Sequence, residues 1–169
     1  MAINITYKVL THSLSLLSST PSLDEWNDCP NILQGWQFWE DTFMSFESRF
    51  WDVSALGDVI RMSDRPETFS FVHRETLFVG LNLVGGRLHN AVEWQTRLST
   101  QVEWLKTLML QHQRPTVVFG HADPTANHEA FFGPLRDFMQ DEIQNSIPLL
   151  YVNGDRHRYV LSMHPRLYL

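Results

Sequence analysis

The stretch TVVFGH at residues 116–121 decides the fold, together with a second stretch of the same design, LLYVNGDRH at residues 149–157. Each is an apolar run, rich in β-branched or aromatic residues, that is followed by a glycine and then by a histidine. Such runs are typical of buried strands. Open α/β sheets bind their ligands just outside the carboxyl ends of the strands. We therefore expect His121 and His157 to lie at a ligand site along one edge of a sheet.

The rest of the chain supplies helices and strands around these two runs. Aromatic residues recur at helical spacing over 35–50, and two strands over 69–74 and 77–83 flank a turn at Arg74-Glu75. Asn90 is suited to capping a long helix that ends before Pro115, and a second helix is expected over about 128–144. Residues 148–153 predict a strand, and 159–163 fit one more. This alternation predicts an α/β fold in a single domain over residues 1–169.

Composition excludes several classes of protein. The chain has 169 residues with a formal net charge of −6 and no basic run, which argues against nucleic-acid binding. No apolar run approaches the roughly 20 residues of a membrane span, and the N-terminus makes a poor secretory signal. Cys29 is the single cysteine, so the chain can form neither an internal disulfide nor a cysteine zinc cluster. A reducing compartment such as the cytoplasm is compatible with this composition.

Glycines stand ahead of both histidines and let the backbone turn sharply at the strand ends. Imidazole nitrogens and carboxylate oxygens together suit Zn, Mn or Fe better than Ca or Mg. A metal site is therefore one interpretation of His121, His157 and the neighbouring Asp155. The other interpretation is that each histidine is a polar strand-end residue that is hydrogen-bonded to a neighbour.

The two motifs Gly120-His121 and Gly154-Asp155-Arg156-His157 resemble the closing motifs of the calcineurin-like metallophosphoesterase family, usually Gly-His and Gly-His-x-His. Some members carry Gly-Asp-x-His in the last block, as this chain does. In that subgroup an earlier loop reads Pro-Gly-Asp-Asn-Glu-Trp-Asn-Asp-Cys, and residues 21–29 (PSLDEWNDC) resemble its second half closely. The likeness extends from Pro21 to Tyr159, which is most of the chain.

The resemblance implies the C-terminal part of a four-layer αββα sandwich. The family's opening Asp-x-His block and the Gly-Asp block after it have no counterpart before Pro21, so the domain is expected to be N-terminally truncated. Loss of those strands would leave an unpaired sheet edge and an exposed apolar face, which a partner chain could cover. An incomplete gene model of a full-length enzyme is the alternative explanation.

The resemblance also implies a site. His121, His157 and Asp155 would be metal ligands, although Asp155 could instead orient His157. Asp24 falls where the wider family has the histidine that assists the leaving group, which makes it a candidate catalytic residue. The neighbouring ligand position falls on Leu23, which cannot bind a metal, but if the alignment slips by one residue Asp24 could itself be a ligand. His128, near the Gly-His loop, is a candidate catalytic residue that could contact the substrate; the alternative is a structural role near the start of a helix. Arg156, beside His157, could bind the phosphate of the substrate. One divalent ion (Mn, Fe or Zn) is expected rather than two, because the bridging carboxylate is missing.

The function implied is metal-dependent hydrolysis of phosphoric esters, either phosphomonoesters or phosphodiesters, with a small-molecule phosphate ester as substrate. The alternative is a non-catalytic remnant that keeps the scaffold and acts as an interaction module. Bound metal that is lost on replacing His121 would favour the hydrolase, and a metal-independent fold without activity would favour the scaffold.

Overall fold

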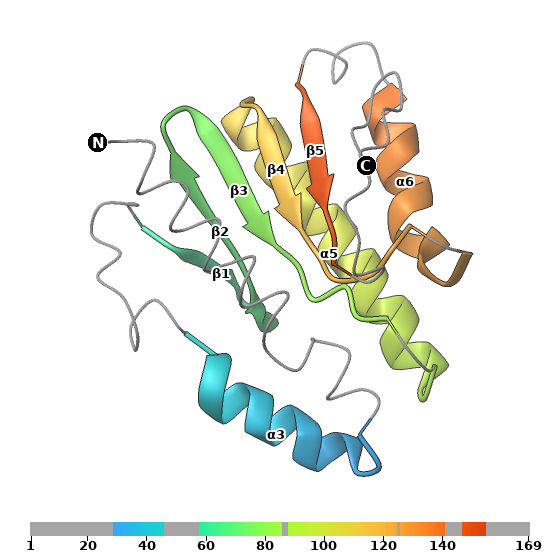
Figure 1. Ribbon diagram of the computed structural model, residues 1–169. Coiled ribbons are helices and arrows are strands. Elements are labelled where there is room, and N and C mark those ends of the chain that lie inside the picture. Colours follow the sequence, from blue (N-terminus) through green and yellow to red (C-terminus); the bar gives the residue numbers. More distant parts are fainter. Residues whose placement is uncertain (1–28, 46–57, 86–87, 125, 141–146, 155–169) are drawn as a thin grey trace.

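A computed structural model describes residues 29–45, 58–85, 88–124, 126–140 and 147–154 of the chain. Three consecutive strands follow the first described helix, and helices and strands alternate after them (Figure 1). In chain order the elements are α3 (Ile32–Phe43), β1 (Ile60–Met62), β2 (Arg65–His73), β3 (Thr76–Gly80), α5 (Ala91–His112), β4 (Thr116–Phe119), the 3-10 turn η2 (Ala126–His128), α6 (Glu129–Gln140) and β5 (Leu149–Val152).

The five strands form one mixed sheet in the order β1-β2-β3-β4-β5. The pairs β1–β2 and β2–β3 are antiparallel, whereas β3–β4 and β4–β5 are parallel. The parallel connections run through α5 and α6, as crossover connections in α/β proteins do. The predicted α/β fold class is confirmed at this level.

The hairpin between β2 and β3 turns at Arg74-Glu75, as the sequence predicts. The strands themselves differ from the expected bounds, because β2 begins at Arg65 and β3 ends at Gly80 rather than Leu83. The early end of β3 has a physical reason. The backbone of Asn82 pairs with the side chain of Gln101 and not with a neighbouring strand.

The long helix α5 begins and ends where local signals predict. The side chain of Asn90 accepts hydrogen bonds from the backbone N–H groups of Val92 and Glu93, each at 3.1 Å. Gln113 follows the helix in the left-handed conformation, with φ 49°, and Pro115 lies just beyond. The predicted second helix also forms, as α6 over Glu129–Gln140, and its expected end at residue 144 lies outside the described residues.

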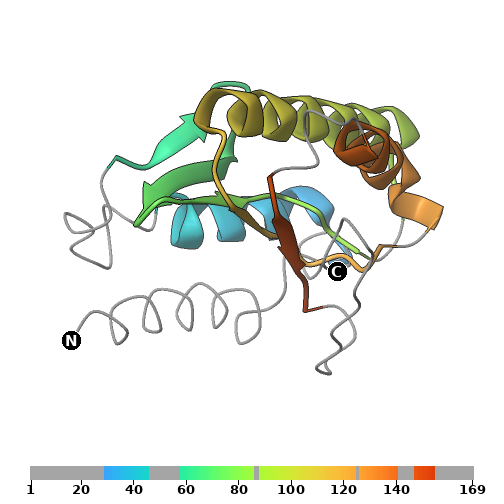
Figure 2. The same ribbon diagram turned by 90° about the horizontal axis from the view of Figure 1, so that it is seen from above.

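Both α5 and α6 cover the same face of the sheet (Figures 1 and 2). The main core fills this layer and includes Leu77 and Val79 of β3, Leu105 of α5 and Leu135 of α6. Phe78, between those two strand residues, belongs to a second cluster with Phe71 and Phe119 on the opposite face. The rings of Phe71 and Phe78 stack with centroids 5.1 Å apart. Both faces of the sheet are therefore apolar at its centre.

Helix α3 lies apart from the α5–α6 layer, near the end of the sheet at which the parallel strands finish (Figure 1). The side chain of Asn31 caps it by accepting a hydrogen bond from the backbone N–H of Gln34 at 3.1 Å. The prediction that the helix continues past Phe43 is wrong for the next residues, because Met44 leaves the helical region with ψ 133° and Ser45 has φ 56°. Residues 46–50 of that prediction, and the strand predicted over 159–163, lie outside the described residues.

None of the helices in the described part combines the length and the apolarity that a bilayer span requires.

Candidate functional site

The loops that follow β4 and β5 start side by side. Phe119 and Val152 are partners in the parallel register, so both strands end at the same level. The backbone N–H of Gly120 donates to the carbonyl oxygen of Val152 at 3.1 Å, and that of Gly154 donates to the carbonyl oxygen of His121 at 3.3 Å. Gly154, the last described residue after β5, therefore lies beside His121.

His121 is held firmly in this loop and is 3% exposed. Its backbone N–H donates to the carbonyl oxygen of Leu83 at 3.1 Å, and Ala122 donates to the same oxygen at 2.8 Å. The Gly-His loop thus lies between the chain that leaves β3 and the chain that leaves β5. A buried imidazole at the carboxyl ends of parallel strands has the position expected of a ligand residue.

Gly120 is required here for space and not for a left-handed turn. Its φ lies outside the left-handed region, but a Cβ atom at this position would lie 2.7 Å from the hydroxyl oxygen of Tyr151. That hydroxyl donates to the carbonyl oxygen of Ala122 at 2.6 Å. The sequence argument, which relied on backbone freedom, therefore gives the wrong reason for this glycine.

His128, predicted to contact substrate, is a buried residue at the end of η2. Its Nε2 lies 2.7 Å from the carbonyl oxygen of Val84, and because a carbonyl can only accept, Nε2 carries the proton and donates. The ring packs against Trp94 with centroids 5.3 Å apart, and Trp94 Nε1 donates to the carbonyl oxygen of Asn127. These contacts tie η2 to α5 and to the chain after β3.

The other predicted site residues, Asp24, Asp155, Arg156 and His157, lie outside the described residues. His121 is consequently the one member of the proposed ligand set whose surroundings are known. Within the described ranges no group of three or more His, Cys, Asp or Glu side chains is arranged to hold a metal ion.

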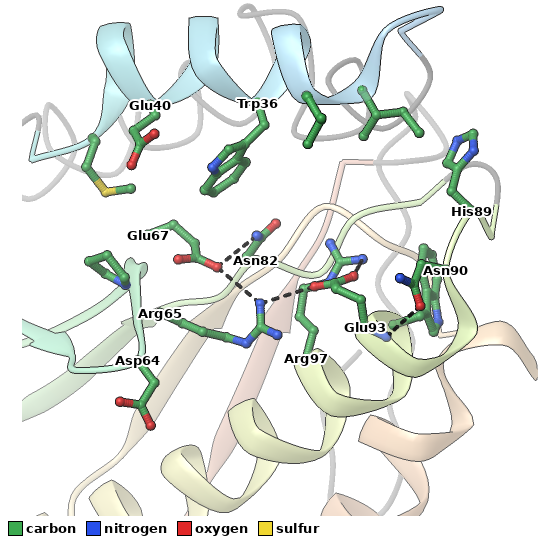
Figure 3. A pocket seen from close by; sticks show the side chains of 15 residues that line it. Trp36, Glu40, Asp64, Arg65, Glu67, Asn82, His89, Asn90, Glu93 and Arg97 are labelled. Atoms are coloured by element: carbon green, nitrogen blue, oxygen red, sulfur yellow. Dashed lines mark hydrogen bonds and ion pairs between the residues drawn. The ribbon is translucent and has the colours of Figure 1, made fainter.

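A cavity of about 540 Å³ opens between α3 and the start of α5 (Figure 3). In the described part of the chain its walls come from α3 and the residue after it, from the start of β2 and the residue before it, from Asn82 after β3, and from the first turns of α5 with the two residues that precede them. Its lining comprises Ile32, Leu33, Trp36, Glu40, Met44, Asp64, Arg65, Pro66, Glu67, Asn82, His89, Asn90, Glu93, Trp94 and Arg97.

Two arginines and two glutamates form an ion-pair network on one side of this cavity. Arg65 Nη1 lies 3.6 Å from Glu67 Oε1 and 3.2 Å from Glu93 Oε1. Arg97 Nη2 lies 3.1 Å from Glu93 Oε2, and the Arg97 side chain is 2% exposed. Burial lowers the pKa of Arg97 from its ordinary value, although the carboxylate of Glu93 opposes this shift.

The side chain of Gln101 holds the base of the cavity in place, because it makes the hydrogen bonds to the backbone that a neighbouring strand would make. Gln101 Oε1 accepts from the backbone N–H of Asn82 at 2.7 Å, and Gln101 Nε2 donates to the carbonyl oxygen of Asn82 at 3.1 Å. The Asn82 side chain in turn donates from Nδ2 to Glu67 Oε1 at 3.1 Å. Each of these residues is buried.

Sequence reasoning missed this cavity and its polar floor. One signal was present in α5, whose apolar stripe through Trp94, Leu98 and Leu105 is interrupted by Arg97 and Gln101. A long polar side chain within a core-facing stripe indicates a buried partner. The sequence gives no indication of where that partner lies.

Comparisons with known proteins find no matching family model, no similar curated protein and no similar solved structure. The functional interpretation of the chain therefore depends on its own residues and their geometry.

Proposed function

We propose that this chain is a metallophosphoesterase-like domain and that its function is the metal-dependent hydrolysis of phosphoric esters. One observation carries the proposal. The Gly-His loop after β4 is hydrogen-bonded through the His121 carbonyl to Gly154, the residue that opens the Asp155-to-His157 segment. The residue that precedes Asp155 in the sequence is thus hydrogen-bonded to His121, and the resemblance implies that both Asp155 and His121 are ligands.

The architecture is compatible with one half of an αββα sandwich. One helical layer, α5 and α6, covers one face of the mixed sheet. The other face carries the aromatic cluster of Phe71, Phe78 and Phe119. An apolar face of this kind is what a second sheet would cover in a sandwich.

The chemistry follows from the types of donor. His121 and His157 offer imidazole nitrogens and Asp155 offers a carboxylate, a set that suits Zn, Mn or Fe. A divalent ion held by these residues would polarise a phosphoryl oxygen and lower the pKa of an attacking water. Arg156, next to His157, would bind the phosphate oxygens through paired hydrogen bonds. Asp24, where the resemblance has a histidine that assists the leaving group, would supply a proton.

The test is metal content of the purified chain, with His121→Ala and His157→Ala prepared in parallel. We expect near-stoichiometric Mn, Fe or Zn in the parent and its loss in both variants. His112→Ala is the matched control, because this half-buried histidine lies in the last turn of α5 and outside the ligand set. Hydrolysis of p-nitrophenyl phosphate and of bis-p-nitrophenyl phosphate should fall together with metal content.

A metal-free parent whose melting temperature does not rise on adding Mn, Fe or Zn would overturn the proposal, since a ligand of the native state must stabilise it. Retention of metal by both alanine variants would equally exclude the proposed ligand set. In either case the scaffold interpretation would replace the hydrolase.

A further inference from the structure

The cavity between α3 and α5 has a buried acceptor at its floor. Asn82 is 3% exposed, and its Nδ2 donates to Glu67 Oε1. A carboxylate can only accept, so the NH₂ group must face Glu67 and Oδ1 must face the other way. Figure 3 shows the amide directed toward the cavity, below Trp36. No donor among the described residues reaches Asn82 Oδ1, which has almost no contact with solvent.

Two carboxylates, on Glu67 and Glu40, line the same cavity as this acceptor. Glu67, whose side chain is 5% exposed, lies beside Asn82. Glu40 descends from α3 on the opposite side of the cavity (Figure 3), and none of the ion pairs found within the described residues involves it. Among the described residues of the lining there are four carboxylates, on Glu40, Asp64, Glu67 and Glu93, and two guanidinium groups, on Arg65 and Arg97.

Aromatic and thioether surface completes the wall. Trp36 points into the cavity (Figure 3), and its ring stacks on Trp39 with centroids 5.0 Å apart. Trp94 and Met44 line the same space. An indole face next to carboxylates attracts organic cations, and the cavity of about 540 Å³ lies within the range of small-molecule sites.

We propose that this cavity binds a small organic cation that carries N–H donors, a primary alkylammonium or a guanidinium. Its donors would reach Asn82 Oδ1 and the carboxylates of Glu67 and Glu40, and its apolar part would lie against Trp36. The donor set favours an organic cation over a metal ion, because no group of three or more His, Cys, Asp or Glu in the described part is arranged for a metal. The proposal uses residues outside the His121 loop and does not depend on the phosphoesterase proposal.

Three ligands with a common phenylethyl skeleton separate charge from hydrogen bonding: phenethylamine, its N,N,N-trimethyl derivative and 2-phenylethanol. Titration calorimetry at pH 7 should show saturable binding of phenethylamine, weaker binding of the trimethyl cation, which lacks N–H donors, and no binding of the alcohol. Equal affinity for the amine and the alcohol would show a merely apolar cavity and would overturn the proposal. Absence of phenethylamine binding would overturn it as well.

Glu40→Gln locates the site, because Glu40 is a half-buried residue on α3 outside both core clusters. Loss of a charged acceptor should raise the Kd for phenethylamine about tenfold. Glu103→Gln removes the same charge from the exposed side of α5, where Glu103 pairs with Lys106, and should leave the Kd within about twofold. An unchanged Kd in Glu40→Gln would place the amine elsewhere and contradict the assignment.

Discussion

Gln101 occupies a position in α5 where an apolar residue would ordinarily complete the core, between Leu98 and Leu105. Its amide satisfies both backbone groups of Asn82 at the point where β3 has left the sheet. Its Oε1 also accepts from Thr68 Oγ1 at 3.3 Å. One side chain thereby makes the hydrogen bonds that a neighbouring strand would make, and it joins α5 to β2 and to the loop after β3.

Replacing Gln101 with Leu should destabilise the protein by about 2–4 kcal/mol, because the N–H and C=O of Asn82 would stay buried without partners. The free energy of unfolding in urea measures this effect. Gln95→Leu, at an exposed position of the same helix, is the matched control and should change stability by less than about 0.5 kcal/mol. A loss of similar size in both variants would mean that the hydrogen bonds to Asn82 contribute little.

At the scale of elements, the turn of the β2–β3 hairpin consists of two residues that are poorly suited to the left-handed backbone conformation they adopt. Arg74 has φ 46° and Glu75 has φ 65°, the pair of left-handed conformations found in a type I′ turn. Asparagine followed by glycine is the preferred sequence there, and other residues strain this backbone. The hairpin therefore forms because its strands pair well, in spite of its turn.

Changing Arg74-Glu75 to Asn-Gly should raise the free energy of unfolding by about 1 kcal/mol. The variant loses the ion pair between Glu75 and Arg114, but an exposed pair of this kind contributes little. Glu75→Gln alone removes the pair and keeps the strained backbone, so thermal unfolding of the two variants separates these effects. A lower melting temperature in the Asn-Gly variant would contradict the prediction.

Local signals explain which elements sequence reasoning found. The cap at Asn90, the stop at Pro115 and the apolar runs that became β4 and β5 act over a few residues, so α5 and both strands were predicted. The strand β1 was missed because its three residues include the polar Arg61 and its pairing with β2 is irregular. The end of α3 was misplaced because the aromatic spacing continues after the backbone changes direction at Met44.

The same distinction between local and long-range signals explains why the sequence predicted one candidate site and not the other. The Gly-His loop directly follows one strand, so the sequence alone was enough to predict His121 as a candidate site residue. The cavity combines Glu40, Glu67, Asn82 and Glu93, which lie on three different elements and one loop. Their proximity depends on how α3 packs at the end of the sheet, and no periodicity in the sequence reports that packing.

At the scale of the whole molecule, stability should be unevenly distributed. Gly35 is the one buried residue among the twelve of α3, whereas α5 buries eight. Elements with few buried contacts open at lower free energy than the core. Hydrogen exchange should therefore be faster for the amides of α3 than for those of α5 over residues 98–109.

Phenethylamine should slow exchange in α3 selectively, because the proposed ligand contacts α3 on one side of the cavity and the fixed floor on the other. Mass spectrometry of peptides from α3 and α5 would measure hydrogen exchange in each helix with and without phenethylamine. Protection of α3 equal to that of α5 without ligand would show that α3 belongs to the cooperative core, contrary to the prediction.

Strand β3 is the only described strand with an antiparallel neighbour on one side and a parallel neighbour on the other. Its pairing with β2 closes a two-residue loop, whereas its pairing with β4 must wait until the chain has travelled through α5. Loop closure is slower for distant segments, so the hairpin should form early in folding and the β3–β4 ladder late. The sheet would then grow in one direction, from the hairpin toward β5, and the loop that holds His121 would be among the last parts of the molecule to take its final shape.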